Sequence, residues 1–126
     1  MKKVITTSNA PAPIGPYNQA ILTGNTLYIS GQIALDPATG KLVLDNIKEE
    51  TTQVMQNLKA VLKAANMTFE NVVKSSIFIS NMDDFSIIND VYGSYFDEAK
   101  APARETVQVA KLPKNVNVEI SMIAVI

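Results

Sequence analysis

The chain has 126 residues and a net charge of −1, and it contains no histidine, cysteine or tryptophan. This length suits a single domain, residues 1–126, while the missing side chains exclude imidazole acid–base catalysis, thiol nucleophiles, disulfides and nearly all zinc sites. The near-neutral charge offers no basic surface to nucleic acid or anionic membranes, and no apolar run approaches the roughly 18 residues of a membrane span.

The first third of the chain is expected to form a stiff loop and then a β-hairpin. Residues 6–9 are polar where a signal peptide would be apolar, which predicts a cytoplasmic protein. Prolines then fix several φ angles between residues 11 and 16. Two strand-like runs, 19–23 and 26–33, flank Gly24-Asn25, a typical two-residue hairpin turn. Alternation in the second run separates two faces: Leu27, Ile29 and Ile33 on one, and Thr26, Tyr28, Ser30 and Gln32 on the other.

Apolar residues at helical spacing predict two helices, the first over 47–65 and the second from about 83 to 99. Asp45 or Asn46 can cap the first helix. Its apolar stripe lies opposite a polar side: Ile47, Val54, Met55, Leu58, Val61, Leu62 and Ala65 against Glu49, Glu50, Gln53, Gln56, Lys59 and Lys63. The second helix has its own apolar stripe of Phe85, Ile88, Val91, Tyr92, Tyr95 and Phe96.

Runs rich in β-branched residues predict three further strands, over 72–80, 104–110 and 116–126. One more strand precedes the first helix, although the pattern does not define its limits. The predicted order is therefore β-β-β-α-β-α-β-β. This order predicts an α+β fold in which a mixed sheet carries two helices on one face.

The last predicted strand is apolar on both of its faces. One face can be covered by the helices and carries Val116, Val118, Ile120, Met122, Ala124 and Ile126. On the other face Ile123 and Val125 lie beside Glu119 and have no helix to cover them. A partner subunit is the economical cover, so we expect an oligomer.

Arg104 and Glu119 are the strongest candidates for chemistry. Arg104 is the only arginine among 11 basic residues, and a planar guanidinium can grip a carboxylate or phosphate with two hydrogen bonds. Glu119 should be partly buried, so it needs a partner or its pKa rises. Either it pairs with Arg104 or Lys111, or it lies close to the ligand of Arg104 and deprotonates a water. The alternative for Arg104 is an interface ion pair, or a single arginine by chance.

Weaker candidates are Tyr17 after the rigid loop, Ser30 on a strand face and Asn89 beside the second apolar stripe. Together with Arg104 and Glu119 they fall within segments that resemble the RidA (YjgF-type) family of reactive-intermediate imine/enamine deaminases. The segments are Ile14–Ala20, Leu27–Gln32, Ile88–Tyr92, and Pro102–Arg104 through Val118–Ile120. The resemblance runs over essentially the whole chain in matching order and spacing.

The resemblance implies an α+β unit of the chorismate-mutase-like type, assembled as a homotrimer with active sites between subunits. It implies hydrolysis of 2-imino acids, and of the enamines that tautomerise to them, to 2-keto acids and ammonia. Such intermediates are released by pyridoxal-phosphate dehydratases acting on serine or threonine. No metal or organic cofactor is implied.

The resemblance also assigns roles to individual residues. Arg104 would bind the substrate carboxylate, Glu119 would hold the attacking water, and backbone groups around Thr106 and Val107 would contact the imine nitrogen. The cleft would be lined by Tyr17, Ser30, Gly31 and Asn89, with Tyr17 reaching in from a neighbouring subunit.

Two departures from the family pattern follow the arginine. Glu105 stands where many members have a small residue, and Thr106 where many have cysteine. Strand alternation should point Glu105 away from the Arg104 side chain. Two other functions remain open. One is a non-catalytic regulator that binds 2-keto acids in the same cleft. The other is an RNA-acting translation inhibitor, which the absence of a basic stripe and of histidine argues against.

Overall fold

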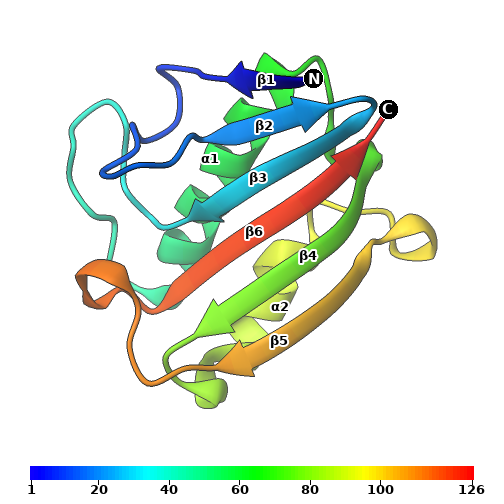
Figure 1. Ribbon diagram of the computed structural model, residues 1–126. Helices are drawn as coiled ribbons and strands as arrows, with labels where there is room; N and C mark the ends of the chain where they lie inside the picture. Colours follow the sequence, from blue (N-terminus) through cyan, green and yellow to red (C-terminus); the bar gives the residue numbers. More distant parts are fainter.

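Figure 1 shows a computed structural model that describes all residues from 1 to 126, with one twisted sheet in front of two helices. The six strands lie in the order β1-β2-β3-β6-β4-β5, and every neighbouring pair is antiparallel except β4 and β5. The strands are β1 Lys2–Ile5, β2 Ala20–Thr23, β3 Thr26–Gln32, β4 Val72–Ile79, β5 Ala103–Gln108 and β6 Val118–Val125. The helices are α1 Ile47–Ala64 and α2 Phe85–Gly93. The predicted α+β class, element order and mixed sheet are confirmed.

The two helices begin close to their predicted positions, but α2 ends early. Asn46 caps α1, its Oδ1 accepting a hydrogen bond of 2.8 Å from the backbone of Glu49. The second helix ends at Gly93 rather than near residue 99, and at this end the Ser94 hydroxyl donates a 2.6 Å hydrogen bond to the carbonyl of Val91. Tyr95 and Phe96 still pack against the core, but from a turn. Neither helix combines the length and apolar character that a membrane crossing needs.

Glu50 corrects the expected polar side of α1. Its side chain is fully buried and accepts hydrogen bonds at the start of β6. The donors are the backbone N and Nδ2 of Asn117, both at 2.7 Å, and the backbone N of Val118 at 3.2 Å. Apolar periodicity assigns every charged residue to the exposed side of a helix. A carboxylate that accepts several hydrogen bonds can nevertheless be buried at low cost.

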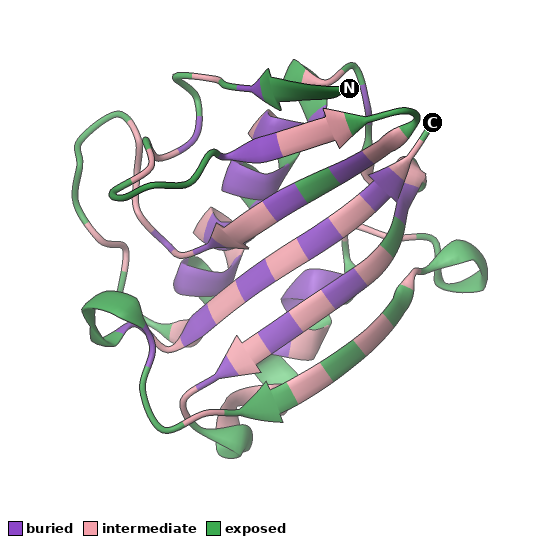
Figure 2. Ribbon diagram, viewed as in Figure 1, coloured by how far each residue is buried: buried purple, intermediate pink, exposed green.

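The two faces of the sheet differ as the alternation in β6 predicts. On the helix side Val118, Ile120, Met122 and Ala124 are at most 2% exposed. Figure 2 shows the resulting stripes of buried and half-buried residues along β6, viewed from the side without helices. On that open face Ile123 and Val125 are half-buried. Ile126 follows the strand and is 72% exposed, so the helices do not cover it as expected.

A β-bulge interrupts the pairing of β3 with β6. Ile29 pairs with Met122 and Gln32 pairs with Ile120, so Ser30 and Gly31 together oppose a single residue. The extra residue inverts the alternation that the sequence predicted. Gln32 is therefore only 5% exposed and lies on the helix side, not on the face of Tyr28.

Candidate active site

The candidate residues fall into two groups on opposite faces of the sheet. The first group, from β5 and α2, comprises Arg104, Thr106 and Asn89 on the helix side. The second group, from the N-terminal loop, β3 and β6, comprises Tyr17, Ser30, Gly31 and Glu119. Val107 lies on the open face of β5.

Strand register places Arg104 and Glu119 on opposite faces. Arg104 pairs with Ser75, which pairs with the buried Met122 on the helix side. Glu119 pairs with Phe78 on the open face. Paired residues on neighbouring strands project to the same side, so within one chain Arg104 and Glu119 leave the sheet on opposite faces. That Glu119 lies close to the ligand of Arg104 stays a prediction.

Glu119 also makes none of the ion pairs that the sequence left open. The only ion pair of the structure joins Lys74 to Glu105, with 2.7 Å between Nζ and Oε1. The hydrogen bond to Lys74 is the main cause that lowers the pKa of Glu105. Glu105 lies on the open face, as expected, and so points away from Arg104.

Arg104 is held from several sides by α2. Its Nη1 donates a 2.8 Å hydrogen bond to Oδ1 of Asn89, and its guanidinium carbon lies 5.1 Å from the ring centroid of Tyr92 and 5.7 Å from that of Phe85. Arg104, Asn89 and Tyr92 border a cleft of about 450 Å³. A guanidinium has five N–H donors, so donors remain for a carboxylate.

Tyr92 is a participant that the sequence analysis placed only in the core. Its hydroxyl donates a 2.9 Å hydrogen bond to Oγ of Ser75, which is fully buried. Burial raises the pKa of Tyr92, so the phenol stays protonated at neutral pH. The only sign of this role in the sequence is that the apolar stripe of the second helix has a tyrosine, with a hydroxyl group, where a phenylalanine would serve for packing.

Thr106 has an unused hydroxyl on the same face as Arg104. Its Oγ1 is the only buried side-chain oxygen or nitrogen without a hydrogen-bond partner. Buried polar groups are nearly always paired, so this unpaired hydroxyl, on the same strand as Arg104, makes Thr106 a candidate ligand contact.

Glu119 and Gly31 touch across the bulge. A Cβ atom on Gly31 would lie 2.9 Å from Cδ of Glu119 and would overlap its Oε2, so any larger residue here would require this carboxylate to move. The carboxylate is half-buried and has neither a hydrogen bond nor an ion pair. Burial therefore raises the pKa of Glu119 and makes it a stronger base than an exposed glutamate.

Tyr17 and Ser30 lie on the Glu119 side. Tyr17 and Gly31 border the same small cavity of about 40 Å³. The Tyr17 ring is half exposed, and its hydroxyl accepts a 3.3 Å hydrogen bond from the backbone of Ile14. The hydroxyl of Ser30 donates to the carbonyl of Asn18 at 2.6 Å.

Gln19 positions this loop and was missed by the sequence analysis. It is 2% exposed, and its Oε1 accepts a 2.7 Å hydrogen bond from the backbone of Thr7. Its Nε2 donates to the carbonyls of Thr7, Ala10 and Pro11. One amide therefore ties the proline-rich segment to the start of β2.

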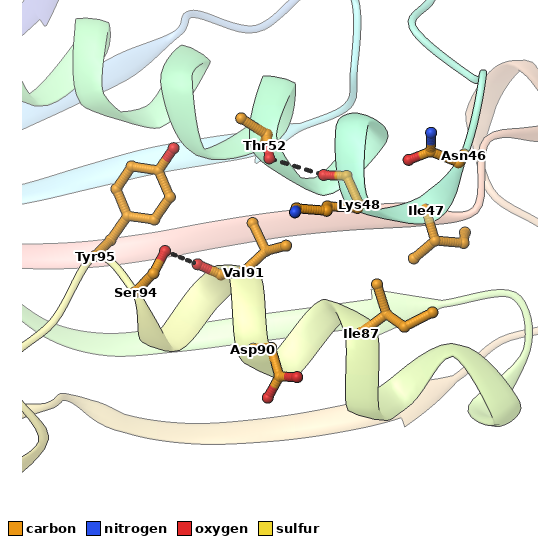
Figure 3. Close-up of a pocket in the computed structure, with 9 residues that line it drawn as sticks. All are labelled: Asn46, Ile47, Lys48, Thr52, Ile87, Asp90, Val91, Ser94 and Tyr95. Carbon is orange, nitrogen blue, oxygen red and sulfur yellow. Dashed lines mark hydrogen bonds between the residues drawn. The ribbon is translucent and has the colours of Figure 1, made fainter.

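A larger cavity lies elsewhere. It is a groove of about 830 Å³ between the start of α1 and the helix α2. Figure 3 shows Ile47 of α1 and Ile87 of α2 on the two sides of this groove. None of the candidate residues lines it. No group of three or more acidic side chains in the chain could hold a metal ion. Size alone therefore does not locate the candidate chemistry.

The family is decided by comparison with known proteins. Residues 7–126 match the family model described as Endoribonuclease L-PSP, and a 2-iminobutanoate/2-iminopropanoate deaminase from Bos taurus is 50% identical over 99% of this chain and 90% of its own. The chain belongs to the RidA/YjgF/RutC family.

Solved structures of this family agree with the fold. RidA from an Antarctic Psychrobacter is 42% identical, covers 98% of this chain and 99% of its own, and superposes with a TM-score of 0.94. Escherichia coli TdcF with bound serine is 40% identical over 98% of both chains, with a TM-score of 0.92. The family assignment that the resemblance suggested is therefore confirmed.

Proposed function

We propose that this protein is a 2-imino acid deaminase that hydrolyses 2-iminobutanoate and 2-iminopropanoate to 2-keto acids and ammonia. Full-length identity of 50% to a relative of that name supports the reaction. The cytoplasm, where dehydratases release such imines, is the proposed place of action. A small amino acid-like ligand also fits the serine found on TdcF.

We further propose that each active site is built from two chains of a homotrimer. Arg104, Asn89 and Thr106 would come from one chain, and Glu119, Gly31, Ser30 and Tyr17 from the next. The observation that carries this proposal is the placement of Arg104 and Glu119 on opposite faces of one sheet. The open face exposes apolar side chains such as Tyr28 at 49% and Val107 at 43%, which suits a subunit contact.

The chemistry needs only binding, a base and water. The free donors of Arg104 would hold the substrate carboxylate, while the Thr106 hydroxyl and nearby backbone groups of Thr106 and Val107 would contact the imine end. Glu119 would take a proton from a water whose oxygen bonds to the imine carbon, while the C=N π electrons move to nitrogen and nitrogen takes a proton from solvent. Glu119 would then return its proton to the nitrogen of the carbinolamine. The C–N bond breaks as the hydroxyl proton is lost to water, which releases ammonia and leaves the keto acid. Because the imine is already activated, positioning supplies much of the acceleration.

The direct test is a coupled assay. A serine or threonine dehydratase generates the imine in situ, and its decay is followed with and without this protein. Faster decay with release of ammonia is expected. An unchanged decay together with tight binding of 2-oxobutanoate would indicate the non-catalytic regulator instead.

Complementation tests the shared site. Arg104→Ala and Glu119→Gln should each be nearly inactive alone. If the site joins two chains, any mixed ring of three contains one intact pair, so an equal mixture refolded together should recover about one quarter of wild-type activity. No recovery in verified mixed oligomers would contradict a site shared in this way.

A further inference from the structure

We propose that Tyr92 and Phe85 are positioning residues that clamp the guanidinium of Arg104 for carboxylate binding. The inference rests on the proposed function and adds how neighbouring side chains orient the guanidinium. It concerns residues that contact Arg104 and not the reacting atoms.

The clamp follows from the spacing of residues on α2. Phe85, Asn89 and Tyr92 stand at positions i, i+4 and i+7 of the helix, so they share one face. That face lies over β5, and each of these side chains meets Arg104. The helix therefore presents a ring, an amide and a second ring to one guanidinium.

The two rings and the amide constrain different freedoms of Arg104. Both rings lie within about 6 Å of the guanidinium carbon, the range of a cation–π contact. The 2.8 Å bond from Nη1 to Asn89 then fixes rotation within the guanidinium plane. An arginine side chain otherwise loses much rotamer freedom when it binds a ligand, and a preorganised one has already lost it.

Tyr92 is itself held in place. It is 4% exposed, and its hydroxyl bond to Ser75 anchors the far end of the ring on β4, beside the strand that carries Arg104. This anchor separates two roles of Tyr92. The hydroxyl contributes to folding stability, whereas the ring face helps to orient the guanidinium of Arg104.

The clamp should act equally on bound substrate and on the transition state, because the carboxylate is present in both. Loss of one ring should therefore raise KM, and the Kd for 2-oxobutanoate, about three- to tenfold, with kcat changed less than about twofold. A residue with a purely structural role would lower the amount or stability of folded protein without this pattern.

The experiment compares Tyr92→Leu and Phe85→Leu with two controls. Tyr92→Phe keeps the ring but leaves Ser75 unpaired, so it should lower Tm and raise KM less than Tyr92→Leu does. Phe69→Leu removes a ring that does not contact Arg104. This ring belongs to the adjoining aromatic cluster, 5.2 Å from the ring of Tyr95 and 5.4 Å from that of Phe96. This substitution should also lower Tm and leave KM unchanged.

The outcomes separate this inference from the proposed function. If Arg104→Lys lowers kcat/KM but both leucine variants keep KM and Kd at the level of Phe69→Leu, the clamp is wrong and the function stands. If Arg104→Lys has no effect on activity, the assignment of the site fails, and the clamp fails with it. Should Tyr92→Leu not fold, Phe85→Leu alone decides, because Phe85 is only partly buried.

Discussion

The surroundings of Arg104 and of Glu119 are organised in opposite ways. Arg104 has a hydrogen-bond partner and two aromatic neighbours within one chain. Glu119 is half-buried against a glycine and has no polar partner. The first region orients its guanidinium before any ligand is bound. The second holds a carboxylate that no cation of the same chain neutralises.

The difference shows how the two roles require different environments. An arginine that binds a carboxylate gains from fixed geometry, and bonds to neighbours cost it little because it keeps free donors. A general base loses function if it forms an ion pair, since a nearby cation lowers its pKa. Placing the two groups on opposite faces of one sheet keeps them from pairing within a chain. Each of the following predictions changes one of these two regions and leaves the other intact.

Glu119→Gln should give the largest effect on turnover. Glutamine keeps the size of the side chain but cannot take a proton, so kcat should fall about 100-fold or more while the Kd for 2-oxobutanoate changes little. Steady-state assays and calorimetry measure the two quantities. Glu105→Gln is the matched control on the same face and should retain most activity. Unchanged turnover in Glu119→Gln would make Glu119 a structural residue.

Arg104→Lys should lower kcat/KM by about one to two orders of magnitude. Lysine keeps the charge but loses the planar pair of donors, and each charge-assisted hydrogen bond is worth roughly 1.5–3 kcal/mol. The oligomer mass by light scattering should be that of a trimer for wild type and variant alike. If Arg104→Ala instead dissociated the oligomer, and residual oligomer kept full activity, Arg104 would be an interface residue.

Gly31→Ala should affect activity more than stability. The added methyl group must displace the Glu119 carboxylate, the far end of a flexible side chain, so we expect about a tenfold loss of kcat and a change in the free energy of unfolding below about 1 kcal/mol. Chemical denaturation and the coupled assay measure these changes. Gly93→Ala is the control for stability, because a Cβ there meets nothing within 4 Å. Full activity of Gly31→Ala would contradict a role for the position of the Glu119 carboxylate.

The smallest effect concerns pH and stability. Burial raises the folded-state pKa of Glu119 above its ordinary value of 4.5, so its contribution to stability is present in acid and lost as pH rises through the folded pKa. Glu119→Gln should therefore have a higher Tm than wild type at pH 7, and the difference should shrink below the ordinary pKa. The activity of wild type should fall in acid at a higher pH than an exposed glutamate would give. A lower Tm for the variant at pH 7 would mean that Glu119 has a stabilising partner.

Local patterns predicted most of the fold. Alternation in β6 and the apolar stripes of the helices depend on neighbours in sequence, and the structure confirms them. The bulge at Ser30 and Gly31 could not be foreseen, because a bulge is defined by the partner strand and not by its own residues. The burial of Glu50 likewise depends on Asn117, which is distant in the chain.

The site was predicted as a set of residues but not as an arrangement. The lone arginine and the half-buried glutamate could be found by composition and alternation. Which faces they occupy depends on β5 pairing in parallel with β4, a long-range contact that no local pattern encodes. The roles of Gln19 and Tyr92 were missed for the same reason, since both act through partners far away in sequence.

The side-chain hydrogen bonds of Gln19 determine how easily the N-terminal segment opens locally. The segment that carries Tyr17 is rich in proline, so it has few N–H groups with which to join a sheet. A single amide makes the contacts to Thr7, Ala10 and Pro11 instead. Breaking that anchor would loosen the stretch from Thr7 to Pro11 while the six strands stay paired. Hydrogen exchange at Thr7 should therefore report a local opening next to the proposed active site without unfolding of the domain.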